Sequence, residues 1–184
     1  MPLQKVEMYH EEISYEVKKY SFNSEYLSFI PIDIRVYLEK IGLPSVVAFD
    51  ALSFTPYSEE NTIITGENRE TAFLIVGKLT HFYCDFGLQV YLNLKTRVVM
   101  IDDPYSTEKV LFANADFFAF VNFVTIYLQQ IILYIDMSDN EISMQNPADW
   151  LVARFNAIDP LALSSPENFW TLFIDAIKRN YNPN

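Results

Sequence analysis

The residue types best suited to catalysis lie in one short segment, HFYCD, at positions 81–85. It contains the single cysteine, Cys84, and one of the two histidines, His81; the other is His10. A thiol beside an imidazole can form a thiolate nucleophile. However, the aromatic and acidic neighbours of Cys84 favour the neutral thiol, and a nucleophile and its base are normally brought together by the fold rather than by such short spacing. We therefore predict that Cys84, His81 and His10 have no catalytic role.

Residues that could bind a metal or a phosphate are also sparse. One cysteine and two distant histidines cannot complete a tetrahedral zinc site without carboxylates. Asp102 and Asp103 could contribute to a magnesium site, but adjacent acids at the end of a strand more often face solvent. Gly77-Lys78 lacks the glycine spacing of a phosphate-binding loop, and no Gly-x-Ser-x-Gly, Walker or HExxH motif occurs. We therefore expect no bound metal and no cofactor, and an enzyme is the weaker class.

The composition describes an acidic, well-packed protein. The chain has 13 basic and 24 acidic residues and a net charge of −11. This charge repels nucleic acid and anionic membranes and attracts basic partners, although ordinary solubility would also explain it. A hydrophobic content of 51% and an aromatic content of 16% exclude intrinsic disorder.

Two further features bear on localisation. A single cysteine cannot form an internal disulfide, and the opening MPLQKVEMYHEE lacks the apolar core of a signal peptide, so we expect a cytoplasmic protein. Residues 117–135 carry no formal charge, which raises the question of a membrane span. Polar residues interrupt this segment at Asn122, Thr125, Gln129 and Gln130. Because Asp116 and Asp136 flank it without a nearby lysine or arginine, a buried helix is favoured over a span.

The elements that must position any site begin with helical segments. We expect the opening third of the chain to be helical, ending in the segment IPIDIRVYLEKIGLP. There Pro31 fits a first helical turn, Gly42 fits a left-handed cap, and Pro44 prevents continuation.

Strand-like segments follow at 46–54 and 72–76, separated by the polar loop TPYSEENTIITGENRE. The segment DFGLQVYLNLKTRVVMID, 85–102, then predicts a hairpin with its turn at Lys95-Thr96-Arg97. Successive strands without intervening helices favour an antiparallel sheet. Helices are predicted at 117–135, at 147–156 and from the start signal Ser164-Ser165-Pro166-Glu167 onward. Strands lying between helical ends indicate an α+β fold.

Four segments in a fixed order carry the most specific pattern: IGLPSVVAFDALSF, FLIVGKL, LQVYLNLKTRVVMID and LFANADFFAFVNFVTIYL. Their order and spacing resemble the SUKH superfamily, and its fourth group, the immunity proteins of bacterial polymorphic toxin systems, is the most similar. The resemblance covers residues 24–177. The family's pattern falls on Gly42, Leu43, Pro44, Gly77, Asn93, Thr96, Val98, Asn114 and Phe120, and its C-terminal tryptophan helix falls on Trp170.

Two residues of the hairpin depart from that pattern. Asn93 stands where the family often has aspartate, and Arg97 stands where it has glycine. The last position of a three-residue hairpin loop usually takes a positive φ, which costs an arginine about 1 kcal/mol. The turn is therefore either of a different type or strained.

The resemblance implies a single α+β domain over 1–184, with an N-terminal extension at 1–23 and a core at 24–181. Its centre is a curved antiparallel sheet of about four to six strands flanked by helices. It also implies a non-enzymatic immunity protein that binds and neutralises a cognate toxin domain, secreted or delivered by contact. A basic nuclease or deaminase toxin would suit the acidic charge. The alternative is a SUKH-type interaction module in a regulatory or signalling assembly.

Acidic and aromatic residues are the candidates for binding such a partner, although each could equally be a solvated loop residue. They are Tyr57, Glu59, Glu60, Glu67, Glu70, Asp102, Asp103 and Tyr105. We expect no direct nucleic-acid binding, no membrane association, and a monomer or weak dimer.

Overall fold

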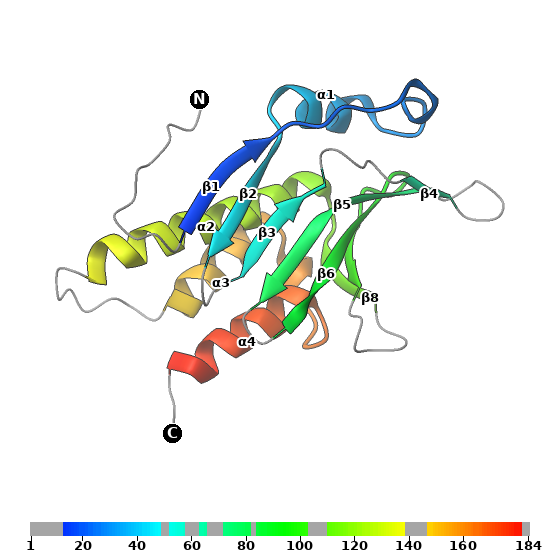
Figure 1. Cartoon of the computed structure of the whole chain (residues 1–184). Helices are drawn as coiled ribbons and strands as arrows, with labels where there is room; N and C mark the ends of the chain where they lie inside the picture. The colour runs from blue at the N-terminus through cyan, green and yellow to red at the C-terminus, as the bar shows by residue number, and fades with distance from the viewer. Residues whose placement is uncertain are drawn as a thin grey trace. The chain divides into compact units, whose positions relative to one another are not determined.

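The protein is described here by a computed structural model, drawn in Figure 1. The described residues are 13–48, 52–57, 63–65, 72–81, 84–102, 110–138 and 147–181. The chain groups into two compact units. Unit 1 comprises Met1–Thr96 and Asp102–Lys109, and unit 2 comprises Arg97–Ile101 and Val110–Asn184.

Unit 1 is built on an antiparallel sheet (Figure 1). Its strands are β1 (Ile13–Lys18), β2 (Leu43–Ala48), β3 (Ser53–Pro56), β5 (Ala72–His81) and β6 (Cys84–Asn93), in that spatial order, with β4 (Ile63–Thr65) also paired to β5. The predicted fold class, α+β with an antiparallel sheet, is confirmed, and the sheet is not closed. The predicted domain boundaries stay a prediction.

Three predictions about the first half of the chain are wrong. Ile13–Lys18 is a strand, not a helix, and it pairs with β2 from Ile13 opposite Ala48 to Lys18 opposite Leu43. The physical reason is the alternation in ISYEVK of β-branched or aromatic residues with polar ones, which has a period of two. The segment predicted as one strand at 46–54 is two strands, β2 and β3, with Val46 opposite Phe54. In addition, β4 lies within the segment predicted as a loop.

The predicted helix end at Gly42 is confirmed. Helix α1 (Ile32–Lys40) begins after Pro31, which occupies the cap position rather than the first turn. Gly42 has φ +86°, and its N–H donates to the carbonyl of Tyr37 at 2.9 Å. A left-handed glycine that closes the last turn in this way is a common C-terminal cap.

Unit 2 contains the remaining helices. The elements are β7 (Val99–Asp102), whose last residue groups with unit 1, its neighbouring strand β8 (Val110–Asn114), the short 3₁₀ helix η2 (Pro160–Leu163), and helices α2 (Phe117–Ser138), α3 (Pro147–Ile158) and α4 (Phe169–Tyr181). Helices at 117–135 and 147–156 are therefore confirmed, slightly longer than predicted. Within the described residues, none of the helices has the combination of length and apolar character needed to cross a bilayer.

The predicted start of the last helix is wrong by about one turn. The residues Ser164 to Glu167 form a turn after η2, and α4 begins at Phe169. Asn168 is the residue that starts the helix, because its carbonyl accepts the first helical hydrogen bond, from the N–H of Leu172 at 3.1 Å. Asn168 is held in place by its own side chain, whose Nδ2 donates to the carbonyl of Leu161 at 2.8 Å.

The core of unit 2 is a cluster of rings around Trp170, which is fully buried. The centroid of its ring lies 5.1 Å from that of Phe155, and Phe155 itself stacks on Phe123 at 3.9 Å. The other rings within 6.4 Å of Trp170 are Phe120, Phe123, Phe169 and Phe173.

One buried polar chain crosses this apolar cluster. The indole Nε1 of Trp170 donates to Asn114 Oδ1 at 2.8 Å. Asn114 Nδ2 in turn donates to Asp159 Oδ2 at 3.2 Å, and the same carboxylate oxygen accepts the N–H of Ala115 at 2.8 Å. Trp170, Asn114 and Asp159 are thus joined by hydrogen bonds, so the ring cluster can include an indole without leaving its N–H unsatisfied.

Of the two alternatives that the sequence leaves open for the turn after β6, a different turn type or strain, the structure shows the strained one. Asn93 Oδ1 accepts the N–H groups of Lys95 at 3.0 Å and of Thr96 at 2.9 Å. Arg97 then has φ +68°. Among the described residues, it is the one non-glycine residue in the left-handed region. An amide in place of the family's aspartate thus still accepts both hydrogen bonds, whereas arginine in place of glycine carries a steric penalty.

Replacing Arg97 with glycine is expected to raise the free energy of unfolding by about 1 kcal/mol, because glycine adopts a positive φ without a Cβ penalty. Arg97→Ala is the matched control. It removes the weak ion pair between Arg97 Nη1 and Asp116 Oδ2, 3.9 Å apart, but keeps the Cβ atom. Urea denaturation of the three proteins measures the difference. Equal stability of the glycine and alanine variants would show that backbone strain at this position contributes nothing.

Candidate partner-binding surface

The structure describes two of the predicted partner-binding residues, and both belong to unit 1. Tyr57 directly follows β3, and Asp102 is the last residue of β7. Both side chains are partly exposed. The other candidates, Glu59, Glu60, Glu67, Glu70, Asp103 and Tyr105, lie outside the described residues and stay predictions.

Strand β6 contributes the central side chains of this region. Successive residues of a strand face opposite sides of the sheet. Val90 and Leu92 are fully buried on one side, whereas Gln89 and Tyr91 are partly exposed on the other. Sequence reasoning missed Tyr91, although the alternation of buried and polar residues in the hairpin contained the signal that its side chain faces outward.

Strand β5 adds Lys78 to the same side. The Cα partner of Tyr91 is Ile75, and that of Gln89 is Lys78. Ile75 and Lys78 are three residues apart, so simple alternation would place them on opposite sides. A β-bulge between Ile75 and Gly77 changes the register and brings both to the side of Tyr91.

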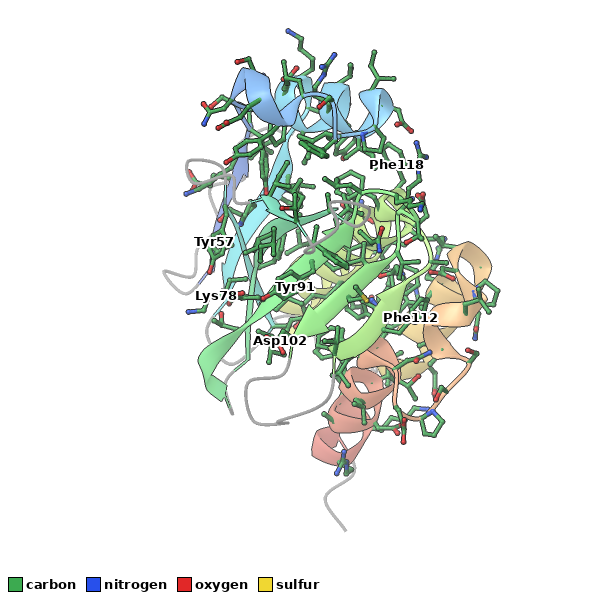
Figure 2. The ribbon with its side chains drawn as sticks, turned by 90° about the vertical axis from the view of Figure 1, so that its right-hand side faces the viewer. Tyr57, Lys78, Tyr91, Asp102, Phe112 and Phe118 are labelled. Carbon is green, nitrogen blue, oxygen red and sulfur yellow. The ribbon has the colours of Figure 1, made fainter. Side chains whose placement is uncertain are left out.

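These side chains define a surface, which we call the outer tyrosine surface: Tyr57, Lys78, Gln89, Tyr91 and Asp102. Figure 2 shows the labelled members Tyr57, Lys78, Tyr91 and Asp102 gathered over the same part of the sheet. The surface therefore combines two phenol rings, an amide, an ammonium group and a carboxylate, all carried by unit 1.

Tyr91 is affected electrostatically by two other members of the surface. Burial raises the pKa of Tyr91 above its usual range, and the Asp102 carboxylate and the Tyr57 phenol raise that pKa further. Tyr91 is therefore a neutral phenol at physiological pH. Its hydroxyl donates a hydrogen bond to Gln89 Oε1, which fixes the direction of the phenolic proton.

Lys78 points away from that group. A Cβ atom built on Gly87 would lie 1.6 Å from Lys78 Cε and 2.3 Å from its Cδ and Cγ. The stem of Lys78 thus lies over Gly87, in space that only a glycine leaves open. Gly87, Gln89 and Tyr91 follow one another along one side of β6, so a stem that leans from the position opposite Gln89 toward Gly87 leads away from Tyr91.

Tyr20 supports the surface from within unit 1. It is 4% exposed, and its hydroxyl donates to the carbonyl of Val76. The same carbonyl accepts the N–H of Tyr57 at 3.1 Å, while the N–H of Tyr20 donates to the carbonyl of Leu38 at 3.0 Å. Burial strongly raises the pKa of Tyr20, so its hydroxyl keeps the proton that it donates. The backbone at Tyr57 is thereby connected to both β5 and α1.

The residues weighed for catalysis are placed only in part. His81 and Cys84 are Cα partners across β5 and β6. Their side chains, and all of His10, lie outside the described residues. Among the side chains that the structure does describe, no three histidines, cysteines or carboxylates gather where they could hold a metal ion.

The structure defines an α+β protein with an open sheet whose outer side presents tyrosines and side chains of both charges. Residues 28–176 match the model of the SUKH-4 immunity protein family. The chain belongs to the SUKH-4 immunity protein family, as its sequence pattern predicts. Membership supports an immunity role and suggests a non-enzymatic protein. No curated protein and no solved structure matches the chain.

Proposed function

We propose that this protein is a cytoplasmic immunity protein that binds a cognate toxin domain through the outer tyrosine surface and so neutralises it. The family match over residues 28–176 carries this proposal, because immunity is the role in the family's description. The surface supports it physically. Tyrosine is enriched among residues that dominate binding energy at protein interfaces, since its ring buries a large area at a small cost in conformational entropy.

The charge of the protein favours a basic toxin, such as a nuclease or a nucleic-acid deaminase. Enzymes that act on nucleic acid carry positive surfaces that attract phosphates. A protein with a net charge of −11 is attracted to such a surface over a distance of about one Debye length, roughly 8 Å at physiological salt. Glu59 and Glu60 follow Tyr57 closely in sequence, and Asp103 follows Asp102, so two of the acidic pairs are continuous in sequence with the surface.

Co-expression with the toxin encoded by the adjacent gene tests this function. We expect the protein to restore growth and to co-purify with the toxin domain. We further expect the association rate to fall about tenfold between roughly 50 and 300 mM salt, because screening removes long-range attraction. Exchanging both Glu59 and Glu60, or both Asp102 and Asp103, for lysine should slow association and weaken its salt dependence. Unfolding free energies should change by less than about 0.5 kcal/mol.

Neither α1 nor α4 carries two adjacent acidic residues that would match the two double exchanges. The control is therefore the single substitution Asp175→Lys, on the exposed side of α4. Because it changes the net charge by half as much as a double exchange, twice its effect on the logarithm of the association rate gives the contribution of net charge alone. A toxin that neither co-purifies nor loses its toxicity would contradict the function. A parent association rate that does not respond to salt would contradict the electrostatic part only.

A further inference from the structure

The outer tyrosine surface has an end that lacks a cation. Tyr57, Tyr91 and Asp102 lie over the same part of the sheet (Figure 2), whereas the stem of the one lysine of this surface leans toward Gly87. Among the described residues, no ion pair engages Asp102. A carboxylate near two phenol rings, with no described lysine or arginine paired to it, is a favourable environment for a cation supplied by another molecule.

The hydrogen bond of Tyr91 also favours a cationic ligand that carries N–H donors. A phenol can donate one hydrogen bond and accept others. The proton of Tyr91 is directed to Gln89 Oε1, so the phenolic oxygen presents its lone pairs outward. Asp102, as a carboxylate, also only accepts. Tyr91 and Asp102 therefore together offer acceptors, and the ligand group that complements them is one that carries several N–H donors.

On this geometry we propose that Tyr57, Tyr91 and Asp102 form a recognition site for a basic side chain of the toxin, best suited to an arginine. The proposal rests on the proposed function and adds the chemistry of the group that is bound. A guanidinium is planar, stacks on phenol rings, and can donate to a carboxylate and a phenolic oxygen at once. A lysine ammonium would satisfy the same acceptors without the planar stacking, so we expect it to bind more weakly.

The position of Lys78 decides between two kinds of partner group, a cation and an anion. If its stem turned toward Tyr91, an ammonium and phenol hydroxyls would together suit an anionic partner group, such as a glutamate. The space over Gly87 holds the stem elsewhere, which favours the cation. The sign of the effect of removing the Lys78 charge therefore distinguishes the two: a cation site binds more tightly without it, and an anion site binds more weakly.

The first experiment uses small probes and the whole protein, with no toxin present. Increasing concentrations of N-acetylargininamide, in the millimolar range, should shift the ring NMR signals of Tyr57 and Tyr91 to saturation. The shifts should disappear in Asp102→Asn, while Asp175→Asn, which makes the same charge change on α4, should keep them. N-acetylglutamate serves as the opposite probe. Equal or larger shifts with N-acetylglutamate, or unchanged arginine shifts in Asp102→Asn, would overturn the site.

The second experiment measures the dissociation constant of the complex with a catalytically inactivated toxin domain. Tyr91→Ala and Asp102→Asn should each weaken binding about tenfold, mostly through faster dissociation. Lys78→Met should tighten binding two- to threefold, by an estimate of roughly that order for one screened charge. Thermal denaturation confirms that each variant is folded. Weaker binding by Lys78→Met, or an effect of Asp102→Asn no larger than that of Asp175→Asn, would overturn the inference while the complex itself still supported the proposed function.

Discussion

Replacing Trp170 with alanine is expected to lower the free energy of unfolding by about 3–5 kcal/mol, the range for truncating a large buried ring. Trp170 is fully buried among five phenylalanine rings, with centroid distances of 5.0 to 6.4 Å. Truncation removes this contact area and leaves a cavity that rigid rings cannot easily fill. It also removes the donor to Asn114 Oδ1, so a buried amide oxygen is left without its indole partner.

Trp150 provides the matched control, because it is the other tryptophan of the chain. It is only partly buried, and its main described contact is with the guanidinium of Arg154, 5.3 Å from the ring centroid. Trp150→Ala should therefore cost roughly 1 kcal/mol, as for an exposed cation–π pair plus partial burial. Urea denaturation followed by circular dichroism measures both variants. Similar losses for the two substitutions would show that the ring cluster around Trp170 is not a principal source of stability.

Gly42→Ala is expected to lower the free energy of unfolding by about 2–4 kcal/mol, combining a left-handed backbone penalty with overpacking. Gly42 has φ +86°, which L side chains rarely adopt. A Cβ atom there would lie 2.4 Å from the carbonyl oxygen of Lys18 and 2.9 Å from its carbonyl carbon. Both are backbone atoms of β1 at its pairing with Leu43, so relief of the overlap must disturb the β1–β2 ladder.

Gly87→Ala is the control for Gly42→Ala, because Gly87 is not among the glycines with a positive φ. The three atoms nearest to a Cβ atom there all belong to the side chain of Lys78, which is flexible and can move into solvent. Gly87→Ala should therefore change the free energy of unfolding by less than about 1 kcal/mol. Chemical denaturation of both variants gives the comparison, and hydrogen exchange at β1 reports where Gly42→Ala acts. A Gly42 variant as stable as the Gly87 variant would contradict the assigned role of Gly42.

Local patterns predicted the parts of the fold that local physics determines. Gly42 followed by Pro44 predicted the end of α1, and the alternation of Val90 and Leu92 with polar residues predicted β6. For Arg97 the sequence narrowed the turn to two alternatives, and the positive φ in the structure decided between them. The strand Ile13–Lys18 was missed because its short alternating pattern gains stability only from pairing with β2, a partner that lies about 30 residues further along the chain.

The candidate surface was predictable only in part, for a similar reason. Tyr57 and Asp102 were selected for residue type beside acidic loops. Tyr91 and Lys78 were not, because their place on one side of the sheet depends on the bulge between Ile75 and Gly77, and a single sequence does not reveal the register of a bulged pair. The six remaining candidates lie outside the described residues, so their part in the surface stays a prediction.

The alternation along β6 places the residues that stabilise the fold and the residues that could bind a partner on opposite sides of the strand. Val90 and Leu92 are buried in the core, while Gln89 and Tyr91 lie on the other side of the sheet and are partly exposed. If the outer tyrosine surface binds the toxin, as we propose, a changed toxin can be matched by substitutions at these outward positions while Val90 and Leu92 stay unchanged. Insertion of a single residue into the strand would have the opposite consequence, because it would turn Val90 and Leu92 toward solvent and Gln89 and Tyr91 toward the core.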